Sequence, residues 1–154
     1  MADRTDNLKL RAARPSDAAN LAAIMRAAYA PFFERIPDLP DVASGLADDI
    51  RQHDVWLALL AAMPRGGVVI NHAGERAHLV NLAVHPKAAG RGLGRALIDL
   101  AVARARDKGA RQLDLATHVM MPENVALYRH LGWQETGRQG NKVFMSRALH
   151  TEDQ

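Results

Sequence analysis

The chain of 154 residues contains no cysteine. Disulfides, thiolate metal sites and a cysteine nucleophile are therefore excluded. Aromatic residues are few, at 5% of the chain, and 20 basic against 17 acidic residues leave a net charge of only +3. The sequence thus offers neither many aromatic stacking surfaces nor a separate basic tail, and we expect no nucleic-acid partner.

Long apolar runs are also lacking. No run reaches the ~18 residues that a transmembrane helix needs. The N-terminus, Met-Ala-Asp-Arg-Thr-Asp, is polar and has no apolar signal core. We therefore expect a cytoplasmic protein with no membrane partner and no metal. Without repeats or linkers, residues 1–154 predict a single domain with an ordered core of about residues 7–149 and short disordered ends.

The first half of the chain predicts a strand, two helices and three more strands. Residues 8–14 alternate apolar and polar side chains, as a half-buried strand does. Pro15-Ser16-Asp17 indicates a helix that starts with Ser16 as its N-cap and ends near Tyr29. The three prolines in residues 30–40 predict a loop. The remaining expected elements are a helix around residues 42–50, strands at 55–60, 68–70 and 78–84, and a turn at 64–67.

The second half alternates helices and strands. A helix is expected from near Gly92 to Lys108, with Gly109 after its C-terminal end. The further expected elements are a strand at 112–117, a loop at 118–122, a helix at 123–131 and strands at 133–138 and 143–147. The order β-α-α-β-β-β-α-β-α-β-β predicts an α/β (α+β) fold, in which a mixed, mostly antiparallel sheet has helices on both faces.

A glycine-rich loop follows the strand at residues 78–84. Glycines at 90, 92 and 94 lead directly into the expected helix. Glycine lets the backbone approach a ligand closely, and the free amides at a helix start attract anions. Lys87, Arg91 and Arg95 flank this loop. The segment therefore predicts a pyrophosphate site.

Two familiar nucleotide motifs do not fit this loop. The P-loop needs a Lys-Ser/Thr pair after its glycines, and none follows. The dinucleotide fingerprint needs Gly-x-Gly-x-x-Gly spacing and an acidic residue at a strand end. Asp114 lies at about the right distance but inside an expected strand.

With this loop placed, the sequence resembles the GCN5-related N-acetyltransferase (GNAT) superfamily from Leu8 to about Leu149. One matching part is Val84-x-Pro86 followed by Ala89-Gly90-Arg91-Gly92-Leu93-Gly94, although the family usually has Gln or Arg where this chain has Ala89. The other runs from Glu123 to Trp133 and contains Asn124, Tyr128 and Gly132 at the family spacing.

The resemblance implies an acetyl-CoA cleft between strands 78–84 and 112–117. It implies that backbone groups of Leu82, Ala83 and Val84 bind the pantetheine arm and the thioester, and that Asn124 contacts the arm. It also implies that Tyr128 lies at the sulfur and protonates the leaving thiolate. The implied pyrophosphate-binding residues are Ala89, Gly90, Arg91, Gly92, Leu93, Gly94, Arg95 and Ala96.

The general base is left open by the sequence. Many members of the superfamily carry a glutamate on the strand before the loop, but here that strand offers His78 and Asn81. His78 and His118 are the candidate bases because imidazole titrates near neutral pH. Glu34, Glu123 and a chain of water molecules are further candidates.

The acceptor amine is expected to bind between residues 29–40 and 118–122. Tyr29, Phe32, Phe33, Met120 and Met121 would make this site partly apolar, while Glu34 and Asp38 would attract an amine. We therefore expect an N-acetyltransferase that acts on a primary amine of a small molecule or peptide. A non-catalytic CoA-binding or regulatory module is the alternative, and a homodimer is an assembly common among such relatives.

Overall fold

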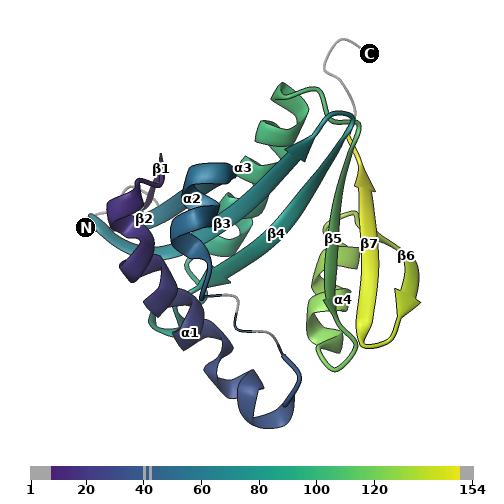
Figure 1. The fold of residues 1–154 in the computed structure, drawn as a ribbon, viewed down its shortest axis with the longest axis horizontal. Coiled ribbons are helices and arrows are strands. Elements are labelled where there is room, and N and C mark those ends of the chain that lie inside the picture. The colour runs from purple at the N-terminus through teal and green to yellow at the C-terminus, as the bar shows by residue number, and fades with distance from the viewer. Residues whose placement is uncertain (1–7, 40, 42, 150–154) are drawn as a thin grey trace.

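Seven strands form one sheet in the computed structural model, which describes residues 8–39, 41 and 43–149 (Figure 1). The disordered ends predicted at residues 1–6 and 150–154 lie outside that range. The sheet order is β1-β2-β3-β4-β5-β7-β6, and only β4 and β5 pair in parallel. The strands are β1 (Leu8–Ala12), β2 (Asp54–Leu60), β3 (Met63–Ala73), β4 (Arg76–Val84), β5 (Gln112–His118), β6 (Gln134–Gln139) and β7 (Lys142–Ala148).

Helices cover both faces of the sheet. They are α1 (Ala18–Arg35), α2 (Leu46–Gln52), α3 (Leu93–Asp107) and α4 (Pro122–His130), with short 3₁₀ turns at Pro15–Asp17 and Pro86–Ala88. The order of elements and the mixed, mostly antiparallel sheet confirm the predicted fold class. Within the described residues, no helix is long and apolar enough to cross a membrane.

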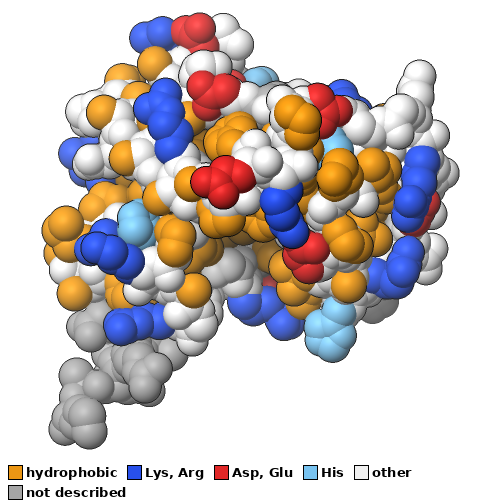
Figure 2. Space-filling model, turned by 90° about the horizontal axis from the view of Figure 1, so that it is seen from below, with side chains coloured by type: hydrophobic (Ala, Val, Ile, Leu, Met, Phe, Trp, Pro, Cys, Tyr) orange, Lys and Arg blue, Asp and Glu red, His pale blue; other side chains and the backbone are white. Residues whose placement is uncertain are grey.

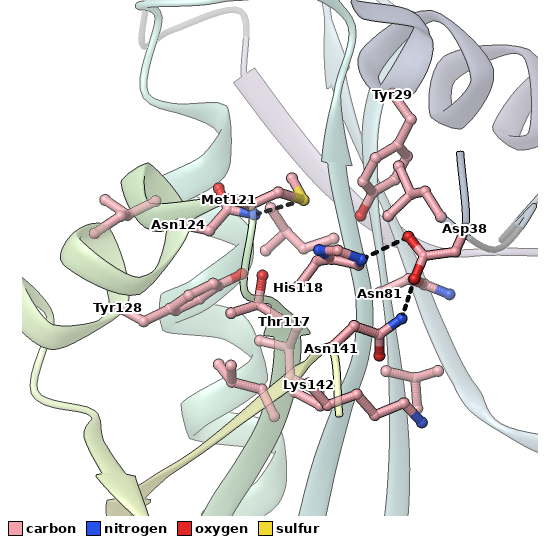
Figure 3. Close-up of a pocket in the computed structure, with 17 residues that line it drawn as sticks. Tyr29, Asp38, Asn81, Thr117, His118, Met121, Asn124, Tyr128, Asn141 and Lys142 are labelled. Carbon is pink, nitrogen blue, oxygen red and sulfur yellow. Dashed lines mark hydrogen bonds and ion pairs between the residues drawn. The ribbon is translucent and has the colours of Figure 1, made fainter. Parts of the chain in front are cut away.

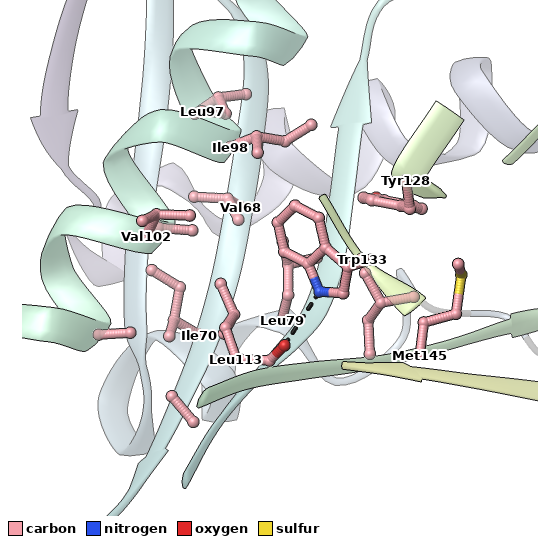
Figure 4. Packing of buried hydrophobic residues seen from close by; sticks show 14 of the residues in the cluster. Val68, Ile70, Leu79, Leu97, Ile98, Val102, Leu113, Tyr128, Trp133 and Met145 are labelled. Carbon is pink, nitrogen blue, oxygen red and sulfur yellow. Dashed lines mark hydrogen bonds between the residues drawn. The ribbon is translucent and has the colours of Figure 1, made fainter. Parts of the chain in front are cut away.

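Two apolar cores result from this layering. One lies under α1 and α2 and contains Leu21, Met25 and Leu57. The other lies under α3 and α4 and continues around Trp133 (Figure 4). The indole N–H of Trp133 donates a 2.9 Å hydrogen bond to the carbonyl of Leu113, so this core spans both halves of the sheet.

The predicted loop at residues 30–40 is wrong in its first part, because α1 continues through Pro31 to Arg35. A proline inside a helix removes one backbone hydrogen bond. Here Tyr29 and Phe32 pack edge to face across that position, with ring centroids 6.4 Å apart. The amide of Ile36 then bonds to the carbonyl of Phe32 and closes the last turn.

Ser16 is not the N-cap of this helix. Asp17 holds that position but makes no side-chain capping hydrogen bond to the helix. Its carboxylate instead accepts the Arg14 amide at 2.7 Å and pairs with Arg11 at 2.8 Å. The hydrogen bonds from Arg11 lower the pKa of Asp17 to about 2. Because Arg11 belongs to β1, the ion pair fixes the helix start to the edge of the sheet.

The turn predicted at residues 64–67 is also wrong, because these residues belong to β3. The turn lies at Ala61 and Ala62, whose φ angles are 50° and 70°. A Cβ on Gly67 would lie 2.4 Å from Leu21 Cδ1, and one on Gly66 would lie 3.2 Å from Leu97 Cδ1. These glycines therefore let α1 and α3 pack against the two faces of β3.

We expect Gly67→Ala to lower the free energy of unfolding by about 1–3 kcal/mol, as overpacking of a core does. The matched control is Gly45→Ala, where an added Cβ meets nothing within 4 Å and φ is −112°. Urea unfolding of both variants measures the difference. Equal stability would show that α1 does not depend on Gly67 for its close approach.

Candidate active site

The parallel strands β4 and β5 pair at only three positions. These are Arg76 with Gln112, Ala77 with Leu113, and His78 with Asp114. Beyond them the two strands separate (Figure 1). A bulge lies at the same place, because the register of β3 with β4 shifts around Val80. Since a bulge bends its strand and breaks the local pairing, β4 turns away from β5 and a fork opens.

The fork contains a cavity of about 480 Å³. Figure 2 views the molecule from the end at which the fork opens, where hydrophobic side chains are interspersed with charged ones. The residues that line the cavity come from α1 and the residues that follow it, from β4, from β5, from α4 and the residue before it, and from the start of β7 and the turn before it. They are Tyr29, Asp38, Leu39, Leu79–Leu82, Leu115–His118, Met121, Asn124, Leu127, Tyr128, Asn141 and Lys142.

One wall of the cavity is formed by α4. Tyr128 is buried and packs edge to face on Trp133, with ring centroids 5.5 Å apart. The Tyr128 phenol is protonated at neutral pH, and burial raises its pKa further above the usual range. Asn124 lies one helical turn earlier and also lines the cavity. Tyr29 reaches the cavity from α1, and burial raises the pKa of its phenol as well.

A hydrogen-bonded network joins three segments at the opposite side of the cavity (Figure 3). His118, at the end of β5, is 2.9 Å from Asp38 through Nε2, and its Nδ1 accepts the amide of Met120 at 3.0 Å. Because Nδ1 accepts, neutral His118 carries its proton on Nε2 and donates it to Asp38. The side-chain amide of Asn141 is a second donor to Asp38. The hydrogen bonds from Asn141 and His118 lower the pKa of Asp38.

The glycine-rich loop presents free amides. Gly90 and Gly92 have φ angles of 79° and 84°, which glycine adopts readily, and Gly92 is the N-cap of α3. The first helical bond of α3 runs from the Ala96 amide to Gly92. Within the described residues, none of the amides of residues 90–95 donates a hydrogen bond to another backbone group. Together with the helix dipole they form an anion site.

The structure brings several predicted residues together at the fork. Leu82, Asn124, Tyr128, His118 and Tyr29 line the cavity. Ala83 is buried toward α1, and Val84 leads from β4 to the glycine-rich loop. At the ends of that loop, the amides of Ala89 and Ala96 are already bonded to Pro86 and Gly92.

Other predicted residues lie elsewhere. His78 comes before the fork and lines a different groove, on the far side of the sheet from Trp133, with Arg76 and Asp114. Phe32 packs on Tyr29 and lies under the Arg35 guanidinium. Phe33, Glu34 and Met120 are also absent from the cavity lining, and Glu123 pairs with Arg35 at 3.5 Å.

Sequence reasoning missed Asn141 and Lys142. The predicted hairpin at the end of the chain contained both residues. If its second strand pairs antiparallel with the strand at 112–118, it starts where that strand ends and brings them beside His118. The observed register pairs His118 with Lys142. It also missed the bulge at Val80, which has no local sequence signal. Among the described residues, no group of three His, Asp or Glu side chains could hold a metal ion.

Comparison with known proteins places these features in context. The sequence profile of the Acetyltransferase (GNAT) family matches residues 21–133. The paiA N-acetyltransferase of Thermoplasma acidophilum, solved in complex with coenzyme A, has a TM-score of 0.82 at 15% identity, covering 92% of this chain and 98% of its own. A GCN5-related N-acetyltransferase of Rhodopseudomonas palustris gives 0.76 at 23% identity, with 92% and 95% coverage. The yncA protein of Salmonella typhimurium, solved with its cofactor acetyl-CoA, gives 0.73 at 18% identity, with 95% and 96% coverage.

Proposed function

The chain belongs to the acetyltransferase (GNAT) family, and from that premise we propose that it transfers the acetyl group of acetyl-CoA to a primary amine of a small molecule or peptide. The observation that carries the proposal is the fork, with Tyr128 and Asn124 on one wall and free loop amides after β4. Two relatives of the same fold hold coenzyme A or acetyl-CoA. The residues of this chain fit such a ligand.

Each part of the cofactor has a matching group. The free amides of residues 90–95, with Arg91 and Arg95 beside them, fit the negative charge of the pyrophosphate. The edge of β4 near Leu82 and Ala83 has no strand partner on the β5 side, so its backbone groups can bond the pantetheine arm. Asn124 would contact the same arm from α4.

In the reaction, the amine attacks the thioester carbonyl directly while both substrates are bound. A C–N bond forms, the C–S bond breaks, and the nitrogen loses a proton. A backbone N–H near Leu82 or Ala83 would stabilise the oxyanion. Tyr128, a phenol that is protonated at neutral pH, would donate its proton to the departing thiolate.

Water is the proposed acceptor of the amine's proton. Both ring nitrogens of His118 are engaged, and Nδ1 can be protonated only if its bond with the Met120 amide breaks. His78 lies in another groove. Asp38 is a weak proton acceptor because its pKa is lowered. A cavity open to solvent lets water remove the proton instead.

The alternative is a module that binds CoA without catalysis. It is considered because β4, which begins at Arg76, carries no Asp or Glu that could act as a general base. A screen of acetyl-CoA thiol release over amines, amino acids and peptides separates the two functions. We expect turnover with at least one amine class. Tight CoA binding without any thiol release would favour the module.

The loop assignment predicts that acetyl-CoA at 100 times its Kd stabilises the folded protein by about 2.7 kcal/mol, which raises Tm. In Gly94→Glu, like-charge repulsion with the pyrophosphate should weaken acetyl-CoA binding about tenfold or more. A Cβ at residue 94 meets only Val84 Cγ2 at 3.8 Å, so Gly94→Ala is the control for the added side chain. Calorimetric titration measures both affinities. Unchanged binding in the glutamate variant would remove the loop from the cofactor site.

The role of Tyr128 predicts that Tyr128→Phe lowers kcat about 100-fold, the contribution of a positioned proton donor, and leaves acetyl-CoA affinity nearly unchanged. Tyr29→Phe is the matched control, since it removes a phenol oxygen from the same cavity. Steady-state thiol release with a substrate from the screen gives kcat for each. If the two variants lose the same activity, Tyr128 is not the proton donor.

A further inference from the structure

Asp38 is a fixed carboxylate at the cavity. It lies after α1, and its oxygens accept hydrogen bonds from His118 at the end of β5 and Asn141 in the turn before β7. The side chain of His118 is 7% exposed, whereas that of Asp38 is 57% exposed. The two hydrogen bonds therefore fix the orientation of the carboxylate, while much of the Asp38 side chain stays exposed to a ligand.

The negative charge of Asp38 is oriented without being neutralised. His118 and Asn141 both serve it as neutral donors, because Nδ1 of His118 accepts the Met120 amide. No lysine or arginine of the described residues comes within 4 Å of it, and Lys142, which also lines the cavity, forms no ion pair with it. A carboxylate held this way suits a cationic ligand group.

Asp38 lies away from the place at which the reacting nitrogen of the acceptor is expected. Asp38 and Tyr128 lie on opposite sides of the cavity (Figure 3), and the thioester is expected beside Tyr128. The attacking nitrogen must also be neutral, and an adjacent carboxylate would stabilise its unreactive ammonium form. The cation that meets Asp38 is therefore a different group of the acceptor.

We propose that Asp38 binds a second positively charged group of the acceptor, so that the substrate class is an amine with another cationic group beyond the reacting nitrogen. His118 and Asn141 are positioning residues that hold the carboxylate toward this group. The proposal rests on the acetyltransferase function proposed above, and it names the part of the acceptor that the site selects.

Binding measurements test the selection without requiring turnover. Calorimetric titration of the CoA-saturated protein compares linear diamines of three to six carbons with the monoamines of the same lengths. We expect the best diamine to bind about tenfold more tightly than its monoamine, since one partly desolvated ion pair supplies the difference. Asp38→Asn should abolish this preference. Asp48→Asn, which removes the same charge from an exposed site on α2, should keep it.

Two substitutions of His118 test the positioning role. The side-chain amide of His118→Gln can take the place of Nε2 and donate to Asp38, so most of the diamine preference should remain. The shorter His118→Asn can replace Nδ1 as acceptor for the Met120 amide but not the donor to Asp38, and should lose most of the preference. Thermal unfolding and CoA titration of each variant report folding and the cofactor site separately.

Equal affinity of the wild-type protein for every diamine and its monoamine would overturn the proposal, as would an unchanged preference in a folded Asp38→Asn variant. If the glutamine and asparagine variants bind diamines alike, His118 does not position Asp38. Absence of CoA binding would instead contradict the proposed function. The diamine comparison on the protein alone then still decides the role of Asp38.

Discussion

The separation of β4 from β5 after three residue pairs is the constraint on which the rest of the molecule depends. Two parallel strands that paired along their whole lengths would leave no space between them. The bulge at Val80 bends β4 while its pairing with β3 continues as far as Gly66 with Val84. The sheet thus stays continuous through β3 and β4, and the backbone groups that lose their β5 partners become available to a ligand.

A fork in a sheet exposes the core unless something closes its back. Trp133 does so here. It follows α4, packs against Tyr128 and hydrogen-bonds to Leu113 near the point where the strands part. Because one aromatic pair both fills the core and positions the cavity-lining phenol, the packing of the second half of the sheet and the chemistry proposed for Tyr128 are physically coupled.

Local signals in the sequence were sufficient for the order of elements and for the glycine-rich loop. Gly90 and Gly92 adopt positive φ angles, as a loop entering a helix needs, and Gly109 follows the end of α3. Predictions failed where the deciding contact is distant in sequence. Gly67 was predicted to lie in a turn, but its small size serves the close contact with Leu21 of α1. Pro31 was predicted to lie in a loop, but the helix continues past it, with Tyr29 packed on Phe32. Asn141 gained its significance only when β7 paired with β5.

The two sides of the cavity differ in the charge of the side chains that they present. The side next to the expected thioester carries the phenol of Tyr128, which is neutral at neutral pH and whose pKa burial raises further. At the other side, hydrogen bonds from Asn141 and His118 lower the pKa of Asp38 and keep a negative charge there. A low-polarity environment favours the neutral amine that must attack, whereas a fixed carboxylate favours a cation. Keeping these two demands on opposite walls lets one cavity hold a charged substrate and still present an uncharged nucleophile.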